Sequence, residues 1–318
     1  MAQKMLAPPA RVFLEPGPLA RAPGRPSGEH FFHLSLTAVA LVFVGVSVVG
    51  LPLARITVPL APLAPRAALF GLLLLGFAYY RWRKEKKLAN LLVIAFWSLV
   101  FSNLYVFPMY LAARSPVGLS DGLLAQADAA MGLTVPDVLR FMDGRPGLSF
   151  LLDVGYQSLL LLTTLAIMLP PLCGQMGRAK EYVIAVLASV LITFPLFAVF
   201  QAEGPWGFYG YAPSADQQKY ADAFSALKTG QWVELSFCHT EGLITFPSFH
   251  TILAVLAAFA LWPIRCVRWP AALLAGLIVA STVTTGWHYV SDVVAGLVIA
   301  AVAGTAAKGY TRLEMKMG

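Results

Sequence analysis

Charged residues are scarce in this sequence: they make up 12% of its 318 residues, whereas hydrophobic residues make up 58%. Soluble domains carry roughly 25% charged residues, so this composition excludes an ordinary soluble fold and indicates a polytopic membrane protein. The 23 Lys and Arg residues exceed the 16 Asp and Glu residues, but they fall mostly in short loops between apolar runs. That placement is the orientation bias of membrane proteins and argues against a nucleic-acid partner.

Cysteine is also rare. Cys173, Cys238 and Cys266 form no CxxC motif and cannot all pair, and Cys238 is expected alone on its side of the membrane, so we expect no disulfide within the chain. We also expect no secretory signal, because the first apolar run begins only near Phe31 and lacks a clear small-residue cleavage site.

Hydropathy predicts an all-α, polytopic membrane helical bundle with about eight transmembrane helices. The expected spans are residues 31–53, 66–82, 88–113, 148–171, 180–201, 247–264, 269–287 and 289–307. The chain then divides into a disordered cytoplasmic tail (1–30), two accessory transmembrane helices (31–87), a six-helix core (88–307) and a second cytoplasmic tail (308–318).

Basic loops predict the orientation of these spans. Residues 81–87, 178–180 and 265–268 are rich in Lys and Arg, so the positive-inside rule places them in the cytoplasm together with both termini. Alternation through eight spans then puts 114–147 and 202–246 outside.

The two outer segments differ in character. Residues 114–147 alternate apolar side chains with acidic ones such as Asp121, Asp128 and Asp137, which predicts an interfacial amphipathic helix or helix pair, or else a solvated connector packed on the spans. Residues 202–246 are rich in Trp, Tyr and Phe, which suits either a lid at headgroup level or an aromatic belt without a catalytic part.

The sequence 246–250, Phe-Pro-Ser-Phe-His, opens one of the expected spans. Pro247 suits a first helical turn and Ser248 is a natural capping residue, so the free backbone N–H groups that follow, beginning with Phe249, point toward an anion such as phosphate. Ionisable side chains at membrane depth are costly, so His250 marks function by default.

The sequence 287–292, Trp-His-Tyr-Val-Ser-Asp, lies at the start of the last expected span. His288 and Asp292 are four residues apart and share a helix face, so the carboxylate can bind one ring nitrogen while the other points at a substrate. His250 from the neighbouring span then completes an acid and nucleophile pair around one phosphorus atom at the external membrane boundary.

A metal site is the sharpest rival interpretation. His239, His250, His288 and Asp292 are side chains that suit zinc. The Ser-capped anion site has no purpose in such a centre, so we expect neither a metal nor a cofactor.

These motifs resemble the type-2 phosphatidic acid phosphatase superfamily, whose pattern is KxxxxxxRP, PSGH and SRxxxxxHxxxD. The second matches at 247–250 with Phe249 in place of Gly, and the third matches at 281–292 with Thr282 in place of Arg. Gly204 and Phe197 stand where the first motif has its Arg and Lys, so the family's phosphate-binding cations are missing.

The departures resemble the inositol phosphorylceramide synthase branch, which has FPSxH, a Ser-Thr pair before the catalytic His, HYxxD and a Pro-Trp pair. The resemblance covers about residues 88–307. It implies that His288 attacks phosphorus and forms a phosphohistidine, that Asp292 orients it, and that His250 serves as general acid and then base. Ser248 and nearby N–H groups, including that of Phe249, would hold phosphoryl oxygens.

The implied substrate is a membrane lipid phosphate, and either water or an alcohol such as inositol can be the acceptor. Charge stabilisation must come from elsewhere than the family's cations; Arg140, Arg145, Lys219 and Lys228 lie on the expected outer side. A non-catalytic lipid transporter or binding protein on a degenerate phosphatase fold remains the alternative.

Overall fold

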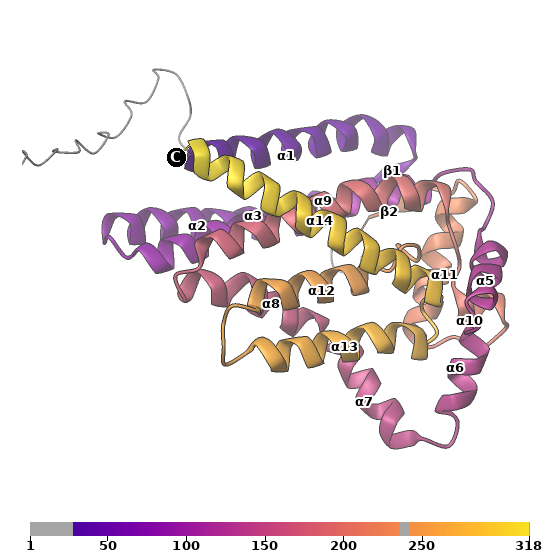
Figure 1. The fold of residues 1–318 in the computed structure, drawn as a ribbon. Helices are drawn as coiled ribbons and strands as arrows, with labels where there is room; N and C mark the ends of the chain where they lie inside the picture. The colour runs from indigo at the N-terminus through magenta and orange to yellow at the C-terminus, as the bar shows by residue number, and fades with distance from the viewer. Residues whose placement is uncertain (1–27, 236–241, 318) are drawn as a thin grey trace, which may run out of the picture.

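The computed structural model describes residues 28–235 and 242–317, and this part of the chain is predominantly helical (Figure 1). The helices are α1 (Gly28–Leu53), α2 (Leu63–Trp82), α3 (Lys86–Leu104), α4 (Val106–Ala113), α5 (Asp121–Ala130), α6 (Val135–Met142), α7 (Pro146–Gln157), α8 (Leu159–Leu172), α9 (Met176–Val199), α10 (Pro205–Phe208), α11 (Ala215–Lys228), α12 (Phe249–Leu261), α13 (Arg268–Thr284) and α14 (Val290–Met317). Two short strands, β1 (Ile56–Thr57) and β2 (Val233–Glu234), pair in parallel. The predicted all-α class is confirmed.

Within the described residues, 5 helical segments are long and apolar enough to cross a membrane: α1, α2, α3 with α4, α9 and α14. Helices α7 and α8 form a pair bent by 42°, which raises the number to 6 if the pair is one span. The two remaining expected spans correspond to the shorter apolar helices α12 and α13. Large apolar side chains such as Leu72, Leu160 and Leu273 are exposed along the bundle, as lipid contact requires.

Helix α12 lies at the centre of the core. It packs against α8, α9, α13 and α14, and Figure 1 shows it between α13 and α14. Its buried Ile252 and Ala257 belong to one apolar cluster with Ile278 of α13 and Ala300 of α14. This packing places the beginning of α12 beside the turn that leads from α13 into α14.

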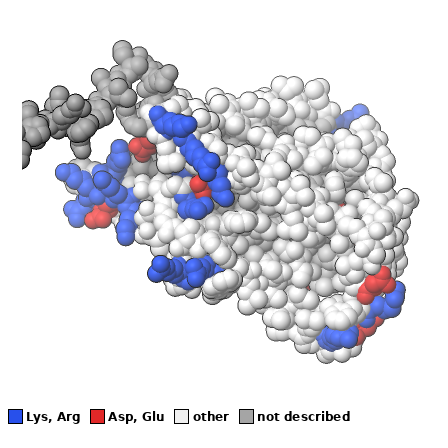
Figure 2. All heavy atoms as spheres, viewed as in Figure 1, with Lys and Arg blue, Asp and Glu red and all other residues white. Residues whose placement is uncertain are grey.

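Basic side chains gather at one end of the bundle (Figure 2). The helix ends and turns there carry Arg81 to Lys87, Arg178 and Lys180, Arg265 and Arg268, and Lys308 to Lys316. Helices α5, α6, α10 and α11 lie at the other end (Figure 1). The charge distribution therefore distinguishes the two ends of the bundle (Figure 2).

The segment 114–147 forms a helix pair, α5 and α6. Leu124 and Val135 are buried against Tyr289 and Val293, whereas Leu123 is 55% exposed. The pair therefore packs directly on the last span with one side and keeps an apolar side outward.

The segment 202–246 is folded rather than irregular in its described part, because it contains α10, α11 and β2. Arg114 fixes it: its guanidinium donates to the carbonyl oxygens of Ala54, Leu227 and Gln231 at 2.9, 2.6 and 2.6 Å. These bonds join the end of α4 to the turn after α1 and to the end of α11.

Helices extend into both segments that were predicted to be tails. Helix α1 already begins at Gly28, and α14 continues through the residues expected as a C-terminal tail to Met317. The extension is held by Lys180, which forms an ion pair with Glu314, and by Thr311, which donates to Glu181 at 3.3 Å. The rest of the expected N-terminal tail, residues 1–27, lies outside the described residues.

Candidate active site

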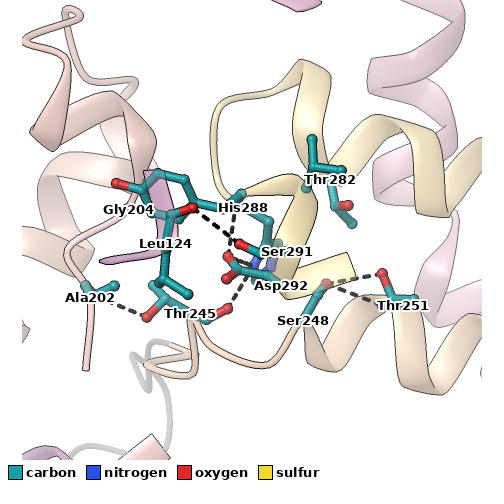
Figure 3. A network of polar contacts seen from close by, with 12 residues as sticks. Leu124, Ala202, Gly204, Thr245, Ser248, Thr251, Thr282, His288, Ser291 and Asp292 are labelled. Atoms are coloured by element: carbon teal, nitrogen blue, oxygen red, sulfur yellow. Dashed lines mark hydrogen bonds and ion pairs between the residues drawn. The ribbon is translucent and has the colours of Figure 1, made fainter. Parts of the chain in front are cut away.

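Ser248 caps α12 and connects the two sequence motifs. Its Oγ accepts a hydrogen bond from the backbone N–H of Thr251 at 3.4 Å (Figure 3). Its own N–H donates to the carbonyl oxygen of Asp292 at 3.0 Å. The helix begins at Phe249, so Pro247 precedes the cap instead of occupying the first turn as expected. The Phe249 ring stacks on Tyr105 with centroids 6.3 Å apart, which leaves only its backbone for binding an anion.

His288 lies in the turn between α13 and α14 and is 3% exposed. Its Nδ1 is 2.8 Å from the carbonyl oxygen of Thr245 and 3.3 Å from Oδ2 of Asp292 (Figure 3). Both neighbours are acceptors, so Nδ1 carries the proton and Nε2 keeps its lone pair. Burial lowers the pKa of His288 to about 4, against the opposing effect of the hydrogen bond to Thr245, so the ring is neutral at pH 7.

Asp292 stabilises the turn more than the ring. Its Oδ2 accepts the backbone N–H of Tyr289 at 2.8 Å, which is closer than the 3.3 Å to His288. Because the imidazole is neutral, the contact with His288 is a hydrogen bond rather than an ion pair. The Thr245 carbonyl makes the shorter contact with the ring, and the sequence could not indicate it because a loop carbonyl leaves no side-chain signal.

His250 faces His288 from the first turn of α12. The two ring centroids are 6.0 Å apart, and the ring planes are inclined by 60°. On the other side the His250 ring stacks on Tyr156 of α7, with centroids 4.7 Å apart and an angle of 19°. The structure therefore brings together His250, His288, Asp292 and Ser248 from the two motifs, and it adds Tyr156, which no local pattern distinguished.

Two carboxylates of α5 also reach this region. Asp128 accepts the backbone N–H groups of Val290 and Ser291 at 2.9 and 2.8 Å. Asp121 accepts the hydroxyl of Tyr289 at 2.9 Å and the N–H groups of Glu203 and Gly204, both at 2.9 Å. The sequence showed these residues only as the polar side of an amphipathic segment.

The three residues that stand in place of the family's cations make other contacts. Gly204 has a φ of 112°, and its N–H donates to Asp121, while Phe197 is buried in the apolar core. Thr282 turns its hydroxyl back to the carbonyl oxygen of Val279 at 2.7 Å.

The four basic residues considered as replacements have their contacts elsewhere. Arg140 pairs with Asp137 at 3.1 Å, the Arg145 guanidinium lies 4.1 Å from the centroid of the Phe141 ring, and Lys219 pairs with Asp216 at 2.8 Å. Lys228 donates to Gln201 and to the carbonyl oxygens of Ser115 and Val117. The backbone N–H groups at the start of α12, beside His250, are therefore candidate positive dipoles for binding an anion.

Within residues 28–235 and 242–317, His, Cys, Asp and Glu side chains form no cluster of three that fits a metal ion. His239, one member of the zinc set considered from sequence, lies outside the described residues, as does Cys238. The other two cysteines, Cys173 and Cys266, are free thiols.

A family model described as the PAP2 superfamily matches residues 122–306, which extend from α5 into α14 and include both histidine motifs. No curated protein and no solved structure gives a significant match.

Proposed function

Because the chain belongs to the PAP2 superfamily, we propose that it is an integral-membrane lipid phosphatase or phosphotransferase that acts through a phosphohistidine intermediate. The observation that carries this proposal is the position of the two rings. His288 has its Nδ1 proton directed at Thr245 and Asp292, and His250 lies 6.0 Å away, so both rings can contact one phosphoryl group.

In the proposed first step, Nε2 of His288 attacks phosphorus and the bond from phosphorus to the leaving oxygen breaks. His250 gives a proton to that oxygen, while Thr245 and Asp292 hold the Nδ1–H of the nucleophile. The N–H groups at the start of α12, beginning with Phe249 after the Ser248 cap, stabilise the phosphoryl oxygens.

In the second step, His250 takes a proton from the acceptor, whose oxygen attacks phosphorus and releases Nε2 of His288. Water as the acceptor makes the protein a phosphatase. An alcohol such as inositol makes it a headgroup transferase, which is what the FPSxH and HYxxD sequences favour.

The proposed active site faces the extracytoplasmic side. The basic side chains gather at the opposite end of the bundle (Figure 2), which the positive-inside rule assigns to the cytoplasm. The C-terminal end of α14 and the beginning of α1 both lie at this basic end, so both would face the cytoplasm (Figure 1).

A non-catalytic lipid transporter is the second candidate. Its support is the loss of the family's cations at Phe197, Gly204 and Thr282. The orientation of the His288 ring argues against it. Hydrogen bonds at Nδ1 leave Nε2 available as a nucleophile, and transport needs no nucleophile.

The test is an assay of purified protein with a panel of lipid phosphates, with and without inositol, followed by thin-layer analysis of the lipids and measurement of free phosphate. Free phosphate without a new lipid identifies a phosphatase, and a new headgroup-bearing lipid with little free phosphate identifies a transferase. We expect His288→Ala to lower turnover by at least about 10³-fold, and His30→Ala, a histidine at the other end of the bundle, to have no effect. Full activity of purified His288→Ala would refute the mechanism.

A further inference from the structure

Asp128 caps the last span from a different helix. Helix α14 begins at Val290, and the first N–H groups of a helix have no partner within it. The carboxylate of Asp128, which is fully buried, accepts two of them, from Val290 and Ser291, one on each oxygen. Ser291 adds a third link, because its hydroxyl donates to the carbonyl oxygen of Leu124 in α5 at 3.4 Å.

Asp121, about two helix turns earlier in α5, makes a second connection. Its Oδ1 accepts the Tyr289 hydroxyl, and both of its oxygens accept backbone N–H groups of the loop before α10. Asp121 is 4% exposed. A carboxylate that accepts charge-assisted hydrogen bonds in a buried place holds its donors firmly.

The backbone of residues 288–291 is therefore fixed at every N–H group. That of His288 donates to Thr282 at 3.1 Å, that of Tyr289 to Asp292, and the next two to Asp128. Two of the four partners are thus the oxygens of one α5 side chain. The direction of the His288 ring follows from this backbone, so an element outside the two histidine motifs determines where the nucleophile points.

We propose that α5 is a positioning element of the active site, in which Asp128, with Asp121 as its second contact, holds the turn that carries His288 and Asp292. This rests on the proposed function, since it concerns the same phosphoryl transfer. Neither carboxylate touches the reacting atoms, so both act through the turn.

The test uses the full-length purified protein and compares Asp128→Asn with the wild type. Asn keeps one acceptor oxygen but turns an amide N–H₂ toward the second backbone N–H, so the turn loses one bond and the charge. Small displacements of a reacting group cost roughly 10²-fold in rate. We expect kcat to fall about 10- to 100-fold with KM within about threefold of the wild type, because the ground-state binding surface is unchanged.

Orthovanadate alone provides a readout that does not depend on the lipid. As a mimic of the transition state it senses the position of the nucleophile, and its affinity is measured from the shift that it causes in thermal unfolding. We expect the dissociation constant to rise about 10-fold or more in Asp128→Asn. Asp137→Asn is the matched control, because Asp137 shares the capping box of α6 with Thr134 and pairs with Arg140, away from the turn. This variant should bind vanadate as the wild type does.

Tyr289→Phe is the second variant, in case Asp128→Asn does not fold. It removes only the hydroxyl that Asp121 accepts, and we expect a smaller loss, about threefold to 10-fold, in kcat and in vanadate affinity. If His288→Ala keeps the wild-type vanadate affinity, the proposed function itself is wrong. If His288→Ala abolishes binding while a folded Asp128→Asn, or Tyr289→Phe in its place, retains wild-type kcat and affinity, only the positioning role is overturned.

Discussion

The backbone N–H of Ser248 donates to the backbone carbonyl of Asp292 at 3.0 Å. This bond joins the start of α12 to the first turn of α14, and so it joins the histidine motif at 246–250 to the one at 287–292. Gly296 makes the approach possible: a Cβ built at this position would lie 2.8 Å from the carbonyl oxygen of Ser248 and 3.1 Å from Cβ of Thr251. The two motifs can meet because the last span has no side chain there.

Gly296→Ala should therefore separate the motifs. The added methyl group meets backbone, which cannot rotate away, so α12 must shift and His250 with it. We expect activity to fall at least about tenfold, although Ala is the better helix former by about 1 kcal/mol. Gly304→Ala in the same helix is the control, because its Cβ would be an ordinary 3.8 Å from Leu256. Equal activity of the two variants would contradict the close-approach argument.

Asp292 should be needed for turnover more than for folding. In Asp292→Ala the N–H of Tyr289 loses its acceptor and the His288 ring loses one of two orienting contacts, while Thr245 still holds Nδ1. We expect kcat to fall about 10²- to 10⁴-fold in a protein that still elutes as a single species in detergent. Wild-type turnover of the purified variant would remove Asp292 from the mechanism.

Tyr156 should matter through its ring rather than its hydroxyl. It stacks on His250 at 4.7 Å and holds that ring opposite His288. Aromatic pairs contribute about 0.5–1.5 kcal/mol beyond their area, so Tyr156→Ala should cost about threefold to 10-fold in kcat and Tyr156→Phe almost nothing. A loss in Tyr156→Phe as large as in Tyr156→Ala would instead assign a role to the hydroxyl.

The pH dependence should show the burial of His288. Burial lowers its pKa to about 4, and only the neutral ring has a lone pair on Nε2. The reactive form is therefore present above that pKa and is lost as the pH falls through it. The acid limb of log kcat/KM, measured with a phosphodiester lipid whose own ionisation lies lower, should fall near pH 4 to 5. An acid limb at 6.5, the ordinary pKa of histidine, would contradict a buried, neutral nucleophile.

Chelation and vanadate separate the two interpretations of the histidines. A histidine nucleophile oriented by a carbonyl and a carboxylate works without a metal, so activity should persist in EDTA and orthovanadate should inhibit. Activity that is lost in EDTA and restored by zinc would favour the metal site instead.

The sequence by itself determined the membrane class, the approximate positions of the apolar helices and the residues of the two histidine motifs. Each of these depends on local properties: hydropathy along a run, the preference of Ser248 for a helix start, and the four-residue spacing of His288 and Asp292. The match of the PAP2 superfamily to residues 122–306 agrees with the family resemblance drawn from these motifs.

Only the tertiary structure decided which groups surround the motifs. Thr245 acts through a backbone carbonyl, Tyr156 through its place on a neighbouring span, and Asp121 and Asp128 through contacts more than 160 positions away along the chain. None of these contacts changes the local pattern of the sequence, because each depends on where two distant segments meet. The partners of the basic residues also depend on the tertiary structure. Lys228 binds Gln201 and the loop after α4 because folding brings these segments together.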